Sequence, residues 1–585
     1  MKKVVDIGVK YIGYYILLFG TFLLLSFGMN DHAFYLHMRR FIPAALACIV
    51  PYILIKNYSL KYFCSEILVA CSWAYTIPVI NHISNKNAAS SMTFPYEIAF
   101  GAYIFTALVL CKMLLNKNRA CNFLYILFKG CLLLVPAVHL VHYGLFHHGV
   151  TTNTVMVVFQ TNLTESLEYL HSLNPVIYAA ALVALGLFFF LSYKESSSLK
   201  NHLEVEFLGK KSSYVAICLI PILAYYSLYS LAPRTGYLST PIAVRNYFLS
   251  VAKYEEMHSE IAENLQVKNN YKGTKPHTII MVIGESATRD FMSAFYSMED
   301  NTTPWLKEQK DIILAKNVYA GAWNTVPALE RALTEANFYN NAEFNSSISI
   351  IDIAKKAGYK TYWFSKQGKV GVYDTPITLV AETADVSMWD GSSPYDESLL
   401  DDLQKVNPEE NNFVVLHLMG SHIDYNNRYP SKYQIYTDPD TSGRLADYKN
   451  SLLYTDTVLK EIFEYGERHL NMDAMVYFSD HGTDPNRSRD PDESRFIGLR
   501  VPLFVYLSKD YRDNNAEVAN ALEANKDKFF SNDLMFNLMC GIMNVSSDHY
   551  KEEESLTSAK YRFDVNSVKA GLGTKSVKDD PWLKR

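Results

Sequence analysis

Residues 278–285 read TIIMVIGE, and this short stretch decides how the second half of the chain folds. An unbroken run of apolar and β-branched residues is typical of a strand buried on both faces, as in a mostly parallel sheet covered by helices. The run stops at Gly284, and an acidic residue, Glu285, follows at once. Because active sites in such sheets gather at the carboxyl ends of the strands, we expect Glu285 to face a site.

Three further runs have the same character. They are FVVLHL (413–418), AMVYF (474–478) and PLFVYL (502–507). Helical patterns lie between them. We therefore predict an α/β domain over residues 276–545, with a central, mostly parallel sheet and helices on both faces.

The ends of these predicted strands carry candidate metal ligands. Glu285 follows the first strand, and Asp480 and His481 follow the run 474–478. A catalytic zinc takes about three protein ligands from Asp, Glu, His or Cys and keeps one position for chemistry. These three residues and one hydroxyl would form such a site. The alternative is that Asp480 only caps the loop that follows its strand.

Thr325 is the candidate hydroxyl. It precedes a helical pattern through Thr334, with Pro327 in the first turn, where proline is tolerated. The start of a helix favours a bound phosphate, and metal coordination can turn a hydroxyl into a nucleophile. A plain helix cap is the alternative role for Thr325.

The first 232 residues have a different character, because long apolar runs dominate them. A helix needs about 20 mainly apolar residues to cross a bilayer. We predict about seven spans, at 11–29, 41–55, 63–80, 98–115, 123–146, 176–193 and 214–231. The first span has no small-residue cleavage site, so we interpret it as an uncleaved helix.

Lys and Arg in the connecting loops predict the orientation of these spans. The basic loops are those with Lys2 and Lys3, Lys56 and Lys61, Lys117 and Arg119, and Lys194, Lys200, Lys210 and Lys211. This alternation places the N-terminus in the cytoplasm. An odd number of spans then places everything after residue 231 outside, and Arg39 and Arg40 in an outer loop are the exception. We therefore expect a multi-pass protein of the cytoplasmic membrane whose soluble C-terminal half lies outside the cytoplasm. A miscount by one span would place that half inside.

The loop 147–175 lacks Lys and Arg and has a partly helical apolar pattern. An amphipathic helix near 151–173 on the outer membrane surface fits this pattern, and a plain connecting loop is the alternative. Glu66 and Lys129 fall inside predicted spans. Such charges are often functional, but near span ends they can also reach water.

Composition and the remaining segments complete the domain plan. Residues 233–275 form a predicted connector and 546–585 a polar C-terminal tail. The net charge of −5 without a basic stripe gives no indication of nucleic-acid binding. Seven of the eight cysteines lie in the apolar half, so Cys540 alone cannot give the soluble half an internal disulfide.

Several segments together resemble a known family. GESATRDFMSAFYSMEDNTTPWL (284–306) closely resembles the opening signature of phosphoethanolamine transferases of the sulfatase-like, alkaline-phosphatase-type fold. Five further segments resemble the family in the right order: its membrane-facing helix (157–170), nucleophile segment (324–334), substrate-side histidine segment (417–422), helix before the last strand (447–456) and metal pair (478–482). The resemblance spans both halves of the chain.

The resemblance implies a mechanism and a ligand set. Zn²⁺ would be bound by Glu285, Thr325, Asp480 and His481, with Thr325 as the nucleophile. Thr325 would take phosphoethanolamine from phosphatidylethanolamine and pass it to a lipid or glycan acceptor, such as lipid A or another lipopolysaccharide. His422 would contact the phosphoryl group or protonate a leaving oxygen. Substrate-binding residues on the membrane side would be Gln160, Thr161 and Glu165.

Three departures from the family leave the acceptor open. Residues 483–499 lack the histidine that lipid A-modifying members carry, the soluble half has no possible disulfide, and about seven spans replace about five. A phosphoglycerol transferase of the same fold remains the alternative. A sulfatase is disfavoured because Thr325 lacks the C/S-x-P-x-R setting, and a non-catalytic membrane receptor does not explain the polar strand ends.

Overall fold

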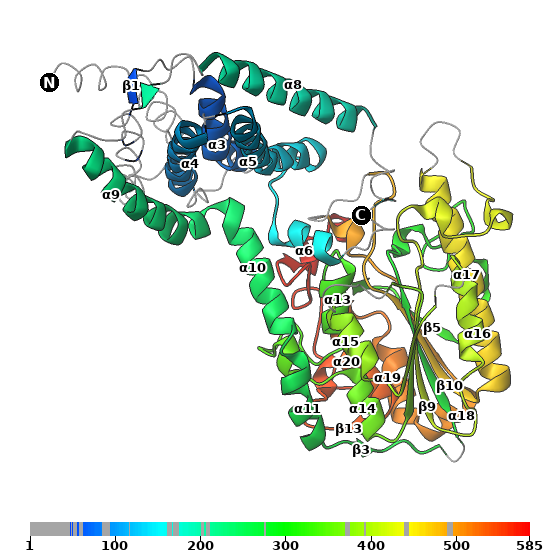
Figure 1. The fold of residues 1–585 in the computed structure, drawn as a ribbon. Helices are drawn as coiled ribbons and strands as arrows, with labels where there is room; N and C mark the ends of the chain where they lie inside the picture. The colour runs from blue at the N-terminus through cyan, green and yellow to red at the C-terminus, as the bar shows by residue number, and fades with distance from the viewer. Residues whose placement is uncertain are drawn as a thin grey trace. The chain divides into compact units, whose positions relative to one another are not determined.

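The computed structural model describes residues 47, 50, 55–57, 63–84, 94–115, 118–160, 167, 175–199, 204–205, 211–273, 276–368, 375–390, 393–437, 444–487 and 495–584. The chain divides into two compact units. One comprises Met1–Met156 and Leu173–Asn246, and the other comprises Val157–Ser172 and Tyr247–Arg585. Each unit is described separately below (Figure 1).

Apolar helices build the first unit. They are α3 (Cys64–Ser84), α4 (Phe94–Leu115), α5 (Arg119–Phe146), α8 (Pro175–Leu199) and α9 (Lys211–Tyr225), which continues into the π-helical η2 (Tyr226–Leu231). α6 (Thr152–Gln160) begins in this unit and ends in the second one. α10 (Gly236–Val251) leads out of this unit. Short strands β1 (Ile55–Asn57) and β2 (Glu204–Val205) pair antiparallel. Large apolar side chains on α5, α8 and η2 are exposed, among them Phe123, Val183 and Leu228, which suits a surface that contacts lipid.

Only some of the predicted spans can be compared with the structure. The spans 11–29 and 41–55 lie outside the described residues, except for positions 47, 50 and 55. The other five coincide with α3, α4, α5, α8, and α9 with η2. Within the described part of the chain, two helices are long and apolar enough to cross a membrane, Tyr96–Leu115 and Arg119–Phe146. The count of seven stays a prediction. Of the predicted surface helix near 151–173, the structure describes α6.

Charged residues inside the apolar helices pair with one another. Glu66 is fully buried, and its Oε1 accepts hydrogen bonds from Lys112 Nζ at 3.0 Å, Tyr125 Oη at 2.5 Å and Lys129 Nζ at 3.4 Å. Lys129 Nζ also donates to Ser65 Oγ at 2.7 Å. Burial of these charges is costly unless they are paired. The ion pairs therefore join α3, α4 and α5, and Lys129 does not extend to water.

The second unit is an α/β domain with a seven-stranded sheet. The strands are β4 (Thr278–Gly284), β5 (Ile312–Ala315), β7 (Lys360–Ser365), β8 (Val386–Trp389), β9 (Asn412–His417), β10 (Met472–Ser479) and β11 (Leu503–Leu507). Their order is β5-β11-β10-β4-β9-β7-β8. The sheet is parallel apart from β11, which runs antiparallel to both β10 and β5. The prediction of a mostly parallel sheet is confirmed, and the four predicted strands are β4, β9, β10 and β11.

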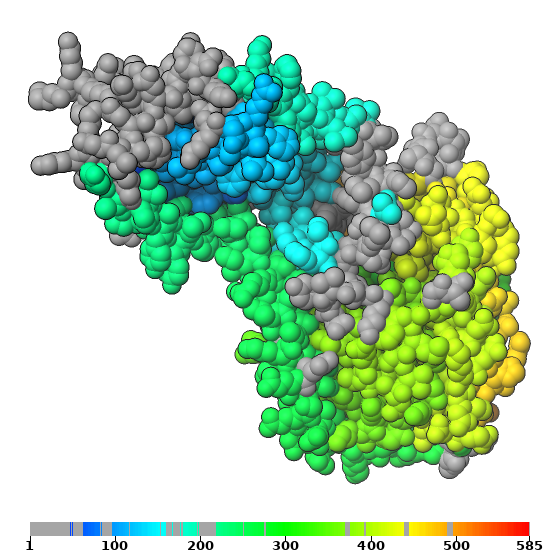
Figure 2. All heavy atoms as spheres, viewed as in Figure 1, coloured from blue at the N-terminus to red at the C-terminus, as the bar shows by residue number. Residues whose placement is uncertain are grey.

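Both faces of the sheet are buried, as continuous apolar strands require. Alternate residues of β4 enter two different hydrophobic clusters: Ile279 and Met281 face one, and Ile280 and Val282 face the other. Helices α13 (Thr325–Ala332), α14 (Ile350–Lys356), α15 (Pro376–Glu382) and α20 (Met535–Ile542) lie on one side of the sheet in Figure 1, and α16 (Leu399–Leu403) and α17 (Arg444–His469) lie on the other. In Figure 2 the yellow-green and yellow side chains of this unit form a closed surface on the side facing the viewer.

Small elements complete the unit. They are α11 (Tyr254–Asn264), α12 (Pro304–Glu308), α18 (Lys509–Asn514), α19 (Ala516–Asn525), β3 (Lys268–Asn269), β6 (Val318–Tyr319), β12 (Phe530–Ser531), β13 (Val545–Ser546), β14 (Lys569–Ala570) and β15 (Lys575–Ser576). β3 of the predicted connector pairs with β13. The connector is therefore packed on the domain from α11 onward.

The C-terminal segment 546–585 differs from the predicted polar tail. Val568, Ala570 and Val577 are fully buried in the same cluster as one face of the sheet. Asp580 is also fully buried and accepts hydrogen bonds from Arg500 Nη1 at 2.9 Å and Tyr319 Oη at 2.9 Å. The polar composition of the segment did not predict this packing, because only a few widely spaced apolar residues contact the core. The segment is part of the α/β domain.

Candidate active site

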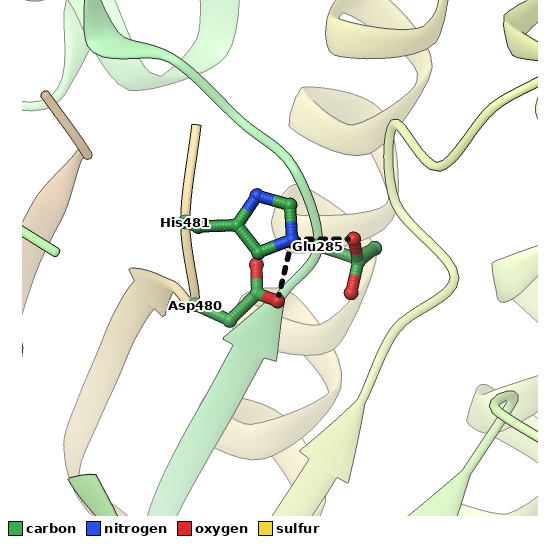
Figure 3. A group of neighbouring side chains, drawn as sticks. All are labelled: Glu285, Asp480 and His481. Atoms are coloured by element: carbon green, nitrogen blue, oxygen red, sulfur yellow. Dashed lines mark ion pairs between the residues drawn. The ribbon is translucent and has the colours of Figure 1, made fainter. Parts of the chain in front are cut away.

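The candidate metal ligands meet at the carboxyl ends of two neighbouring strands. Glu285 follows β4, Asp480 and His481 follow β10, and these strands pair in parallel, with Ser479 opposite Gly284. Figure 3 shows the three side chains pointing toward one another. One potential ligand atom from each lies within 4.8 Å of the others. All three residues are buried, at 1 % exposure or less.

The backbone between the strands shapes this cluster. Ser286 adopts a left-handed conformation with φ of 59°, which is uncommon for a residue other than glycine. In that conformation its N–H donates to Asp480 Oδ1 at 3.0 Å, and its hydroxyl donates to Glu285 Oε1. The strained turn therefore orients both carboxylates.

The hydrogen bonding of His481 fixes which ring nitrogen faces the cluster. Nδ1 lies 2.9 Å from the carbonyl oxygen of Gly482, which can only accept, so Nδ1 carries the proton. Nε2 then presents an electron pair and lies 3.4 Å from Glu285 Oε1 and 3.3 Å from Asp480 Oδ2. This is the orientation that a histidine needs to bind a metal.

The donor set fits a divalent cation. Among the described residues, none donates a hydrogen bond to the buried Asp480 Oδ2. Burial and the nearby Glu285 carboxylate raise the pKa of Asp480. Two adjacent buried carboxylates carry unfavourable negative charge, and a cation bound between them would offset it. Glu285, Asp480 and His481 therefore form a candidate metal site.

Thr325 completes the cluster from a different element. It is the first residue of α13, and Asn324 occupies the cap position before it. The Thr325 hydroxyl donates to Glu285 Oε2 at 2.9 Å and lies 3.4 Å from His481 Nε2. A side chain that only capped the helix would instead accept a hydrogen bond from the next turn. The hydroxyl faces the candidate metal ligands.

His422 lies on the loop that follows β9, and this loop passes directly against Glu285. Ser421 N donates to the Glu285 carbonyl oxygen at 3.0 Å. Gly420 has φ of 52°, and a Cβ there would lie 2.9 Å from both Glu285 N and O, so only glycine fits. His422 Nδ1 contacts the Ile423 carbonyl oxygen at 2.7 Å. The structure thus brings the backbone next to His422 to the site.

Three further predicted substrate-binding residues lie at or beyond the end of α6 in the sequence, and their roles stay predictions. Thr161 and Glu165 lie outside the described residues, as does the side chain of Gln160, whose backbone ends α6.

One buried histidine near the site was missed by the sequence reasoning. His417 ends β9, is 2 % exposed, and its Nε2 has no hydrogen-bond partner among the described residues. Burial lowers its pKa to about 4, despite the opposing influence of Glu285. A lone histidine within the apolar run FVVLHL was the available signal, because buried strands rarely carry a polar residue without a purpose.

The chain is similar in sequence to several known proteins. The family model described as Sulfatase matches residues 277–541. The chain is 25% identical to phosphoethanolamine transferase EptC of Escherichia coli (strain K12), over 72% of this chain and 80% of that protein. It is 28% identical to phosphoethanolamine transferase OpgE of the same organism, over 61% of this chain and 70% of that protein.

A solved structure shows the same fold. The integral membrane protein lipooligosaccharide phosphoethanolamine transferase A (EptA) from Neisseria meningitidis aligns with a TM-score of 0.56 at 16% identity. The alignment covers 84% of this chain and 98% of that chain. The likeness therefore includes the apolar helices as well as the α/β domain.

Proposed function

This chain belongs to the sulfatase-fold family of phosphoethanolamine transferases, and we propose that it moves phosphoethanolamine from phosphatidylethanolamine to a cell-envelope acceptor. The observation that carries the proposal is the Thr325 hydroxyl, which donates a hydrogen bond to Glu285 inside the buried Glu285–Asp480–His481 cluster. A hydroxyl held by a carboxylate next to a metal site is an activated nucleophile.

The reaction takes place in two displacements at phosphorus. Thr325 Oγ1 attacks the phosphorus of the lipid, and the bond from phosphorus to the diacylglycerol oxygen breaks. The Thr325 hydroxyl gives up its proton, the diacylglycerol oxygen gains one in exchange, and phosphoethanolamine stays bound to Thr325. An acceptor hydroxyl or phosphate oxygen then attacks the same phosphorus, and Thr325 Oγ1 leaves and regains a proton. Such an exchange has ping-pong kinetics.

Different residues would have different roles in these two steps. Glu285 orients the Thr325 hydroxyl, and Ser286 holds Glu285 and Asp480 in place. We propose that His422 donates a proton to the leaving diacylglycerol oxygen, because the loop that carries His422 contacts Glu285. Glu285, Thr325, Asp480 and His481 would hold Zn²⁺, and the bound ion would polarise the phosphoryl oxygen and lower the pKa of the Thr325 hydroxyl.

The acceptor and the compartment form part of the proposal. Lipid A, another lipopolysaccharide or a glycan would present the accepting oxygen. The apolar helices would cross the inner membrane, with the α/β domain in the periplasm and the substrate-side residues Gln160, Thr161 and Glu165 facing the lipid. A reporter fused after Arg585 would be active only outside the cytoplasm, and activity inside would refute this orientation.

Intact mass of the detergent-purified full chain tests the reaction. After incubation with phosphatidylethanolamine the parent should gain about 123 Da, the mass of a phosphoethanolamine group that replaces a hydroxyl hydrogen. Thr325→Ala should show no gain. A gain only with phosphatidylglycerol would instead favour the phosphoglycerol transferase alternative, which uses the same four residues.

A further inference from the structure

Asn532 lies between the loop that carries the nucleophile and the strand end that carries the Asp–His pair. Its side chain is fully buried. Oδ1 accepts a hydrogen bond from Gly321 N at 2.7 Å. Nδ2 donates to the carbonyl oxygens of Asp480 at 2.7 Å and Ser479 at 3.2 Å. One amide thus ties together two segments that are distant in sequence.

The backbone of Asn532 is fixed by a strand pair on one side and a buried helix on the other. Asn532 directly follows β12, which pairs in parallel with β6 through Phe530 opposite Val318 and Ser531 opposite Tyr319. This register places Asn532 beside the residues that follow β6. On its other side the chain enters α20 (Met535–Ile542), in which every residue is buried. Motion of Asn532 would therefore require the core itself to move.

The two segments that Asn532 joins carry opposite sides of the candidate active site. Gly321 is four positions before Thr325, and Asp480 is itself a candidate ligand. Between them, Thr325 Oγ1 lies 3.4 Å from His481 Nε2. The C-terminal segment holds the other face of the same loop, because Leu572 N donates to the Gly321 carbonyl oxygen at 2.5 Å.

We infer that Asn532 is a positioning residue, which sets the distance between Thr325 and the Asp480–His481 pair. The inference rests on the proposed function, in which these groups act on one phosphorus atom. Only an amide has an acceptor for Gly321 and donors for the two carbonyl oxygens at these positions. Reacting groups must be held within about 0.5 Å of their productive geometry, and a shift of about 1 Å can cost on the order of 100-fold in rate.

A conservative substitution with a matched control tests this role. Asn532→Asp keeps the shape but places an oxygen against the carbonyl oxygens of Ser479 and Asp480. Asn525→Asp makes the same change elsewhere, because the Asn525 amide is also buried and its Nδ2 donates to Leu556 O at 2.9 Å and Ser558 O at 2.8 Å. Both changes remove two hydrogen bonds to carbonyls of the same domain.

Two measurements on the detergent-purified full chain separate positioning from stability. The first is diacylglycerol release from phosphatidylethanolamine, expressed per folded molecule. Asn532→Asp should lower kcat roughly 10- to 100-fold and leave KM within about twofold, because no substrate contact changes. The second is the visible absorption spectrum of the protein loaded with Co²⁺, which should change in Asn532→Asp and not in Asn525→Asp.

The outcomes distinguish this inference from the proposed function. Equal kcat and equal Co²⁺ spectra in the two variants would overturn the positioning role, as would losses that follow only the folded fraction. A parent chain that binds Co²⁺ but does not release diacylglycerol would refute the proposed function, while the spectra would still decide the role of Asn532. A parent that binds no Co²⁺ would overturn the inference as well.

Discussion

The hydroxyl of Thr325 donates a 2.9 Å hydrogen bond to Glu285, although 40 positions separate the two residues. The contact joins the first turn of a helix to the end of the central strand of the sheet. It directs the hydroxyl away from the capping geometry of its own helix and toward the candidate metal ligands.

The identity of the side chain at position 325 should decide whether the covalent adduct forms. Thr325→Val keeps the shape but lacks the oxygen, so we expect kcat to fall on the order of 10³-fold or more, with no mass gain. Thr325→Ser keeps the nucleophile and should retain a measurable adduct. Intact mass and diacylglycerol release check both variants. An active Thr325→Val variant would exclude Thr325 as the nucleophile.

Metal binding should depend on the charge of Asp480. Asp480→Asn keeps the shape but removes a charge from the candidate ligand set, so we expect metal content to fall sharply by elemental analysis. A ligand that binds only the folded state raises the Tm, so added Zn²⁺ should raise the Tm of the chelator-treated parent and not that of the variant.

Asp456→Asn provides the control for the metal prediction. Asp456 is also buried, but it accepts hydrogen bonds from Trp305 N at 2.7 Å and Leu306 N at 3.1 Å. This variant should keep its metal. Full metal occupancy in Asp480→Asn would show that the ligand assignment is wrong.

The buried ion pairs of the apolar helices should be mutually dependent. Glu66→Gln leaves the buried Lys112 and Lys129 without their shared carboxylate, and breaking such a pair costs roughly 3–5 kcal/mol. The double variant Glu66→Gln with Lys112→Met should lose less than the sum of the two single losses. Thermal unfolding in detergent measures all three. Additive losses would mean that the two residues do not interact.

The C-terminal segment should contribute to stability through Asp580. This carboxylate accepts hydrogen bonds from Arg500 and Tyr319. Because hydrogen bonds to charged groups are worth about 1.5–3 kcal/mol, Asp580→Asn should lower the Tm of the full chain measurably. Asp579→Asn, at the exposed neighbouring position, should leave it unchanged. Equal Tm values for both variants would contradict the packed arrangement of this segment.

The pair His549–Glu335 should give stability a small pH dependence. His549 Nδ1 lies 2.8 Å from Glu335 Oε2, and this hydrogen bond raises the pKa of His549. A raised folded-state pKa gives stability that is fully present below the unfolded value of 6.5 and is lost as the pH rises through the folded value. Because the pair is partly exposed, we expect less than about 1 kcal/mol.

Unfolding of the parent and His549→Gln at several pH values checks this dependence. The stability advantage of the parent should be largest in mildly acidic buffer and should disappear in alkaline buffer. A constant difference across the pH range would show that the hydrogen bond does not depend on the charge of His549.

Local sequence predicted the strands that build the centre of the sheet. Runs of apolar residues identified β4, β9, β10 and β11, because burial on both faces requires such runs. β7 (KTYWFS) carries polar residues at both ends and was not predicted. The antiparallel direction of β11 was not predicted either, because the direction of a strand depends on its connections and not on its own residues.

The sequence by itself determined the two-part organisation, the α/β class and the residues Glu285, Asp480, His481 and Thr325 as candidates, because hydrophobic runs and strand ends are local properties. Only the tertiary structure decided that these four side chains meet, that the C-terminal segment packs on the domain, and that Asn532 joins the two sides of the site. Those contacts link residues far apart in the chain. They depend on three-dimensional packing, and no local pattern of residue types encodes them.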